Sequence, residues 1–105
     1  MFEIDGQLYD WDDDKKITNL KKHGISFEHA TTVFKDDLSV LLFDYDHSDF
    51  EDRYKIIGYC EKSQILVVCH CYYEDGEIIR IISARKATAD EKAIYEERGD
   101  YHGFG

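Results

Sequence analysis

The sequence of 105 residues contains no proline and little positive charge, with 13 lysines and arginines against 23 aspartates and glutamates. Without proline, its turns must depend on glycine, asparagine and aspartate. The formal net charge of −10 works against a polyanionic partner, because proteins that bind phosphates usually present a basic face. Long apolar runs are also missing: the longest, residues 65–69, is far shorter than the roughly 20 residues that cross a bilayer.

The N-terminal residues have neither the basic start nor the apolar stretch of a signal peptide, so we expect a cytoplasmic protein without a membrane span. Three cysteines are an odd number in a reducing compartment, which favours buried thiols over disulfides. Hydrophobic residues make up 43% of the chain, enough for one core and too few for two domains. We expect a single domain over residues 1–105, with the tail 100–105 frayed.

The basic residues gather in two parts of the chain, around residues 15–35 and around residues 80–86. Residues 15–35 carry a net charge of +4, whereas residues 1–14 and 36–61 each carry −6. Either basic segment could line one local cationic site on an acidic body. The alternative is that both are solvated edges of helices and strands.

The first half of the chain predicts a short strand and two helices. A strand is expected around residues 7–11, and the acidic triplet 12–14 suits a helix start because carboxylates accept the free amides of the first turn. Lysines near the other end and the glycine of His23-Gly24 predict where that helix ends. Ser26 is the expected N-cap of a second helix, whose apolar residues recur at helical spacing as far as Lys35.

The second half changes to the short apolar segments that are typical of strands. Residues 38–45, 53–60, 64–73 and 77–84 predict four consecutive antiparallel strands, and the third belongs near the centre because it is apolar on both faces. Asp75-Gly76 predicts a tight hairpin turn. A last helix opens at Thr88, which forms a capping box with Glu91.

The predicted order is therefore β-α-α-β-β-β-β-α, an α+β fold in which the helices cover one face of an antiparallel sheet of about four to five strands. The two N-terminal helices and the C-terminal helix are expected to pack on that sheet. The sequence has no repeats and no linker that would divide it.

Three segments together carry a resemblance to a known family. They are Trp11-Asp12 with Asn19-Leu20 leading into Lys22-His23-Gly24-Ile25-Ser26-Phe27; Asp46-His47-Ser48 followed by residues 51–58; and Arg80-Ile81-Ile82-Ser83-Ala84-Arg85-Lys86-Ala87-Thr88. They resemble the BrnT toxin family, whose members belong to the RelE/ParE superfamily of bacterial toxin–antitoxin systems. The resemblance covers roughly residues 9–97.

That resemblance implies a compact RelE-like fold and a ribonuclease that inhibits translation. It also implies neutralisation by a BrnA-like antitoxin with a ribbon-helix-helix DNA-binding region, in a complex expected to hold two copies of each chain. The antitoxin should lay an acidic or apolar segment over the cationic site or beside it. Direct DNA binding by this chain is not expected, since duplex phosphates would repel most of its surface.

Cleavage of RNA without a metal needs groups that remove a proton from the ribose 2′-hydroxyl, return one to the 5′-oxygen and hold the charged phosphorane. Lys22, His23, Arg80 and Arg85 are the candidate catalytic residues, and no cofactor is expected. The alternative for Lys22 and His23 is charge complementarity to the helix dipole. The alternative for Arg80 is a salt bridge to Glu51, Glu61 or another strand carboxylate.

Arg80 and Arg85 present a geometric difficulty, because residues five apart on an unbroken strand point to opposite faces. A bulge at Ser83-Ala84, or the end of the strand there, would bring them together, and we expect such an irregularity. Arg53 and Lys86 are the candidates for binding substrate. Arg53 could equally be an edge charge that protects the sheet.

The cysteines allow a metal hypothesis. Cys69 and Cys71 share one strand face, and Cys60 could approach from the neighbouring strand, but structural zinc sites typically use C-x-x-C turns. Buried free thiols and no metal site are therefore expected. Besides the ribonuclease, two other functions stay open: an interaction module that keeps the toxin fold without cleaving RNA, and a metal-linked sensor. Salt-bridged or scattered arginines would favour the interaction module.

Overall fold

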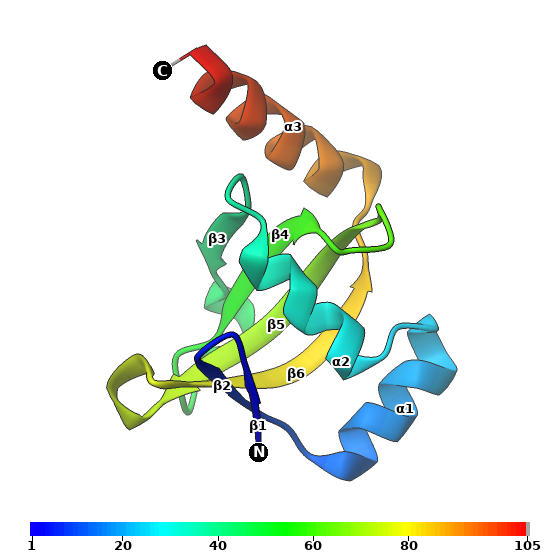
Figure 1. Ribbon diagram of the computed structural model, residues 1–105, viewed down its shortest axis with the longest axis vertical. Helices are drawn as coiled ribbons and strands as arrows, with labels where there is room; N and C mark the ends of the chain where they lie inside the picture. The colour runs from blue at the N-terminus through cyan, green and yellow to red at the C-terminus, as the bar shows by residue number, and fades with distance from the viewer. Residues whose placement is uncertain (105) are drawn as a thin grey trace.

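The structure is a computed structural model that describes the backbone of residues 1–104 and the side chains of residues 1–97 (Figure 1). The sequence predicts that residues 100–105 fray. The side chains of these residues, and Gly105 as a whole, lie outside the described part. The strands are β1 (Phe2–Ile4), β2 (Gln7–Asp10), β3 (Val40–Phe43), β4 (Tyr54–Tyr59), β5 (Ile65–Tyr73) and β6 (Ile78–Lys86). The helices are α1 (Asp13–His23), α2 (Phe27–Ala30) and α3 (Ala89–Phe104), with 3-10 turns η1 (Thr31–Lys35), η2 (Tyr45–His47) and η3 (Glu74–Gly76).

All six strands form one sheet in the order β1-β2-β6-β5-β4-β3. The four predicted strands are confirmed as β3 to β6, each antiparallel to the next, with β5 at an inner position. The expected wholly antiparallel sheet of four to five strands is wrong in two respects. An N-terminal hairpin adds β1, and β2 runs parallel to β6.

The N-terminal hairpin depends on a turn at Asp5 and Gly6, where φ is 51° and 83°. An Asp-Gly pair readily adopts these positive angles, so this turn carries the same signal that predicts the Asp75-Gly76 turn. Three residues on its N-terminal side are enough to pair with β2. The sequence did not predict β1, because three residues are too few to show an alternation of apolar and polar side chains.

Helix α1 begins and ends where the sequence predicts. The Asp12 side chain accepts a hydrogen bond from the amide of Asp14, and Gly24 takes the left-handed conformation with φ 71°. The Gly24 amide then donates to the Leu20 carbonyl at 2.9 Å. In the described part of the chain, no helix is long and apolar enough to cross a membrane.

The second predicted helix is α-helical for only one turn and continues as the 3-10 turn η1. Ser26 is its N-cap, as expected, and accepts from the amide of His29 at 3.1 Å. The hydroxyls of Thr31 and Thr32 donate to carbonyls three residues earlier, at 2.6 and 2.7 Å. Such bonds compete with the helical pattern, and together with the stiffness of β-branched residues they favour the tighter turn.

The helices do not share one face of the sheet, contrary to expectation. Helix α2 and η1 cover one face, where Phe27 and Val33 are fully buried in a core that includes Leu66, Val68 and Ile81. Helix α3 contacts the other face through Tyr95, which joins a smaller core with Val40, Ile57, Ile65 and Val67. Because β5 carries apolar side chains on both faces of the sheet, both faces must be covered. Helix α3 covers part of the second face.

The Tyr95 hydroxyl fixes α3 by donating to Asp36 at 2.6 Å. Burial opposes ionisation of Asp36, but hydrogen bonds from Tyr95 and from the amides of Tyr59 and Leu38 outweigh it and lower its pKa. Beyond this contact α3 extends away from the sheet (Figure 1). Toward the Tyr73 end of β5 and the Ile78 end of β6, α3 therefore does not cover the second face, and the side chains of the strands form its surface.

Candidate functional site

A bulge in β6 determines which side chains share the second face of the sheet. His70 is opposite Ile81 and Cys69 is opposite Ser83, so Ile82 is one extra residue on β6. Arg80 is then opposite Cys71 and Arg85 opposite Val67, two positions of the same parity on β5. The bulge thus places Arg80 and Arg85 on the same face. The expected irregularity is confirmed, although it lies just before the predicted Ser83-Ala84.

Helix α1 covers the part of β6 that β2 leaves unpaired. Strand β2 accompanies β6 only as far as Arg80. Beyond that point the Asn19 carboxamide takes the place of a neighbouring strand, donating to the Ala84 carbonyl at 2.9 Å and accepting from the Ala84 amide at 3.0 Å. It also donates to the Ile25 carbonyl at 3.0 Å. Asn19 is buried. The sequence includes it in the family resemblance but predicts no role for it, because a lone asparagine in a helix carries little signal.

Docking through Asn19 brings the end of α1 beside the bulge. Lys22 and His23 line a groove of about 340 Å³ together with Ile82 and Ser83 of β6. Ser83 shares the face of Arg80 and Arg85, because it is opposite Cys69. The four candidate catalytic residues, Lys22, His23, Arg80 and Arg85, therefore border one stretch of β6. We call these four residues the candidate site.

Each arginine of this face has a carboxylate partner. Arg80 is bonded to Asp10 of β2, and Arg85 makes two bonds to Glu91, at 2.7 and 2.9 Å. The side chains of Arg80 and Arg85 are each 31% exposed, so both pairs can be reached from solvent. The Arg80–Asp10 pair is a salt bridge to a strand carboxylate, the alternative that the sequence left open for Arg80, whereas the Arg85–Glu91 pair was not predicted.

The Arg85–Glu91 pair is held by two hydrogen bonds, whereas the Arg80–Asp10 pair has one. Hydrogen bonds from Arg85 are the main reason that the pKa of Glu91 falls to about 2, and the Thr88 amide adds to the effect. The same bonds raise the pKa of Arg85. Glu91 also closes the predicted capping box, since it accepts from the Thr88 amide at 2.9 Å. One carboxylate therefore caps α3 and neutralises a candidate catalytic arginine.

The two candidate substrate-binding residues lie in different places. Arg53 precedes β4 on the same face as Arg80, and the charges of both arginines act on the Cys71 thiol, whose pKa is raised chiefly by burial. Arg53 is 3.4 Å from Glu51. Lys86 is opposite Leu66 and so has the other parity, and it lines a separate groove with Lys92 and Glu96 of α3 at the end of β6. The structure therefore groups Arg53 with the candidate site and separates Lys86 from it.

Lys55 belongs to the same face and was not predicted. Lys55 of β4 and Ser83 of β6 are both opposite Cys69 of β5, so their side chains lie on the same face. The signal was available in the sequence: Arg53 and Lys55 are two apart on a predicted strand, and such residues share a face.

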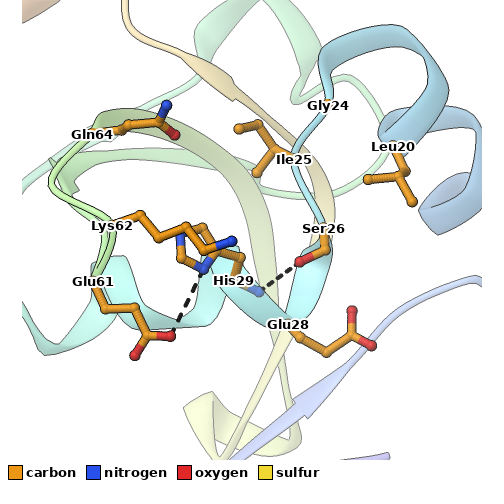
Figure 2. Close-up of a pocket in the computed structure, with 9 residues that line it drawn as sticks. All are labelled: Leu20, Gly24, Ile25, Ser26, Glu28, His29, Glu61, Lys62 and Gln64. Carbon is orange, nitrogen blue, oxygen red and sulfur yellow. Dashed lines mark hydrogen bonds and ion pairs between the residues drawn. The ribbon is translucent and has the colours of Figure 1, made fainter.

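A second cavity, of about 530 Å³, lies on the other side of α1, against α2 and the turn between β4 and β5 (Figure 2). The His29 ring stands against this turn, with Nε2 3.2 Å from the Cys60 sulfur and Nδ1 3.9 Å from the Glu61 carboxylate. Cys60 is 4% exposed and does not open into the cavity. The cluster joins α2 to the β4–β5 turn, and its thiol is inaccessible to a substrate.

The cysteines do not form a common site. Cys60 belongs to the core beneath α2, whereas Cys69 and Cys71 share the opposite face with Arg80. Within the described residues, no group of three or more histidine, cysteine or acidic side chains is arranged to hold a metal ion. All three cysteines are free thiols, as the sequence predicts, but only Cys60 and Cys71 are buried and Cys69 is partly exposed.

Comparison with known proteins places these features in context. Residues 11–91 match the model of the family described as the ribonuclease toxin BrnT of type II toxin-antitoxin systems. The crystal structure of the Brucella abortus ribonuclease toxin BrnT is similar, with a TM-score of 0.60 and 25% sequence identity, over 78% of this chain and 97% of that one. No curated protein matches the chain. The matched residues include Lys22, His23, Arg80, Arg85 and Glu91.

Proposed function

Since this chain belongs to the BrnT family of ribonuclease toxins of type II toxin-antitoxin systems, we propose that it cleaves RNA at the candidate site by general acid–base chemistry, without a metal. The observation that carries this proposal is the β6 bulge, which places Arg80 and Arg85 on one face beside the groove of Lys22 and His23. In a regular strand the two arginines would point to opposite faces and could not bind the same phosphate.

In the proposed reaction the ribose 2′-oxygen attacks the adjacent phosphorus and the bond to the 5′-oxygen breaks. His23 accepts the 2′-hydroxyl proton, because an imidazole can take up and release protons near neutral pH. Lys22 donates a proton to the departing 5′-oxygen. Arg80 and Arg85 hold the phosphorane oxygens, as guanidinium groups do with bidentate geometry. The products are a 2′,3′-cyclic phosphate and a 5′-hydroxyl.

Substrate RNA would follow the strand face on which Arg80 lies. Arg53 and Lys55 extend the positive charge of this face across β4. Lys86 would contact only RNA that continues around the end of β6, because its side chain lines the separate groove there. Phosphate oxygens would take the positions that the carboxylates of Asp10 and Glu91 occupy in the free chain.

The ion pairs themselves favour a second function. Arg53, Arg80 and Arg85 are all bonded to carboxylates, and the chain carries a net charge of −10. A toxin fold in which these pairs do not open would bind its partner without cleaving RNA. That interaction module differs from the ribonuclease in one measurable respect, which is whether RNA displaces the carboxylates.

The partner we propose is a BrnA-like antitoxin with a ribbon-helix-helix region. Such regions are dimers, so the complex would contain two copies of each chain, and the antitoxin would contact the operator. The RelE/ParE superfamily is the fold group we propose for the chain, based on helices packed against a largely antiparallel sheet.

The decisive experiment is cleavage of a fluorescent single-stranded RNA by the purified chain in buffer with EDTA. We expect products that end in a 2′,3′-cyclic phosphate, and at least a hundredfold lower rate for His23→Ala, since general acid–base groups contribute roughly 10²–10⁴-fold. The matched control is Lys21→Ala, because Lys21 is exposed and does not line the groove. Cleavage that requires a divalent metal, or equal rates for wild type and His23→Ala, would contradict the mechanism.

Absence of any cleavage, with the antitoxin complex still formed, would favour the interaction module. In that case RNA binding measured by fluorescence anisotropy should be weak for the wild type. It should stay equally weak when Arg80 is replaced by alanine, because the arginine would not have been available to phosphate.

A further inference from the structure

Strand β3 is an edge of the sheet, and within the described residues no further strand pairs with it. It is the last strand in the sheet order, it consists of Val40, Leu41, Leu42 and Phe43, and it carries no charge (Figure 1). Exposed edges usually hold charged residues, proline or bulges that prevent another strand from pairing with them. Here Leu41 is 50% exposed. An apolar edge of this kind is suited to pair with a further strand.

The free hydrogen-bonding groups of this edge can be assigned from its register with β4. The Asp44 amide donates to the Arg53 carbonyl at 2.8 Å, which makes this a bonded pair of the antiparallel ladder. Bonded pairs recur at every second residue, so Leu42 and Val40 also face β4. The amides and carbonyls of Leu41 and Phe43 therefore point outward, away from the sheet.

Two exposed aromatic residues extend the apolar edge beyond β3. Tyr45 is 83% exposed and Phe50 is fully exposed, in the segment that connects β3 to β4. The ring of Tyr45 contacts that of Phe43, with 4.7 Å between ring centroids. Aromatic residues of this kind are enriched at the centres of protein interfaces. We call residues 36–52, with β3 at their centre, the acidic edge.

The charge of the acidic edge selects the partner. It contains seven acidic residues and no lysine or arginine. A second copy of the chain is a poor occupant, because antiparallel pairing of two β3 strands would bring the exposed Asp37 of one copy toward the exposed Asp46 of the other. Like charges at such positions destabilise pairing.

We propose that the acidic edge binds an extended segment of a partner protein by strand addition to β3, and that this segment is apolar in its middle and rich in lysine or arginine at its ends. Main-chain hydrogen bonds to Leu41 and Phe43 would give affinity, and the flanking charges would give orientation. This rests on the proposed function only in that we take the partner to be the antitoxin. The candidate site then does not need an acidic segment to cover it, since carboxylates of the chain already neutralise its arginines.

The test compares amide hydrogen exchange in the free chain and in its complex with the antitoxin encoded beside it. We expect the amides of Leu41 and Phe43 to exchange rapidly in the free chain and at least tenfold more slowly in the complex. Protection confined to α1 or α3, with β3 unchanged, would overturn the proposal while leaving the antitoxin partner in place. Protection of both amides in the free chain, together with a dimer in light scattering, would identify a second copy as the occupant.

Two variants separate strand addition from other contacts. Leu41→Pro removes an outward amide without breaking a bond to β4, and Leu41→Lys adds a charge that opposes a basic segment. Each should weaken the complex at least tenfold. The matched control is Leu20→Lys on α1, because Leu20 is 49% exposed and Leu41 is 50% exposed. If Leu41→Pro fails to fold, Leu41→Lys alone decides, and equal affinity for Leu41→Lys and wild type would overturn the proposal.

If no antitoxin complex forms, the proposed partner is wrong, and a peptide still tests the edge. The probe is a synthetic nine-residue peptide of alternating valine and threonine with two lysines at each end, compared with the same peptide carrying glutamates. The lysine peptide should slow exchange at Leu41 and Phe43 at low salt and the glutamate peptide should not. Identical behaviour of the two peptides would refute the charge selection. RNA cleavage is not measured here, so loss of nuclease activity and loss of edge binding are distinguishable.

Discussion

Glu91 and Arg85 form a two-point ion pair that ties the first turn of α3 to the end of β6, with oxygen–nitrogen distances of 2.7 and 2.9 Å. The same carboxylate caps α3 by accepting from the Thr88 amide. Arg85 can bind an RNA phosphate only if Glu91 gives up part of this pairing. The position of α3 and the availability of Arg85 are therefore linked.

Replacing Glu91 with glutamine should release Arg85. We expect RNA affinity to rise about threefold to tenfold in fluorescence anisotropy with a single-stranded oligonucleotide, because one competing negative charge is removed beside the phosphate site. Stability should fall by about 1 kcal/mol, the usual size of a lost charge-assisted bond at a partly exposed position. Glu97→Gln is the matched control, since it makes the same charge change on an exposed residue of the same helix. Equal RNA affinity in the two variants would show that Arg85 does not contact RNA.

Replacing Asn19 with alanine should destabilise the whole fold. The change leaves the buried amide and carbonyl of Ala84 without partners, and each orphaned group costs about 1–3 kcal/mol. We expect a loss of about 2–4 kcal/mol in urea unfolding followed by circular dichroism. Thr18→Ala is the control, because Thr18 is exposed on the same helix and should change stability by less than about 0.5 kcal/mol. A loss below 1 kcal/mol for Asn19→Ala would mean that water replaces the carboxamide.

Local signals in the sequence predicted most of the elements and part of the site. The caps of α1 and the hairpin turn at Gly76 follow from residue types that adopt those conformations, and the periodicity of β5 indicated its inner position. The parallel pairing of β2 with β6 and the contact between Asn19 and Ala84 join residues far apart in the chain, which no local pattern encodes.

The same limit applies to the candidate site. An odd separation of Arg80 and Arg85 implied an irregular strand, and the bulge was predicted for that reason. A salt bridge between Arg80 and a strand carboxylate was an open alternative, but the sequence did not identify Asp10, because Asp10 reaches Arg80 only through the β2–β6 pairing. Glu91 was identified as a helix cap, but its second role depends on the direction in which Arg85 leaves β6.

Overproduction of the chain without antitoxin should slow bacterial growth, and Arg80→Ala should relieve the effect while the protein stays folded. The variant removes a phosphate donor from a residue that is partly exposed, so the core is not emptied. Growth curves and soluble protein levels measure the two parts of this prediction. Asp10→Asn is informative beside it, because it frees Arg80 and should leave toxicity unchanged or increase it. Equal toxicity of the wild type and a folded Arg80→Ala variant would remove Arg80 from the site.

The buried histidine His70 should make stability depend on pH. Its side chain is fully buried, with Nδ1 3.0 Å from the Val68 carbonyl and Nε2 3.0 Å from the Tyr72 hydroxyl. Burial lowers the pKa of His70 from 6.5 to about 4, against the opposing effect of the Val68 hydrogen bond. Between these two values the unfolded chain binds a proton that the folded chain does not, so stability rises with pH in this window.

We therefore expect the unfolding free energy of the wild type to fall by about 2–3 kcal/mol as the pH decreases from 6.5 to 4, beyond the change due to carboxylates. His70→Gln keeps a donor and an acceptor in the core but cannot take up a proton, so its stability should change less over the same range. Urea unfolding at several pH values measures both curves. His23→Gln is the matched control for the replacement of a histidine by glutamine, because the His23 ring lines a surface groove rather than the core. Parallel curves for the wild type and His70→Gln would mean that His70 is protonated in the folded protein as readily as in the unfolded chain.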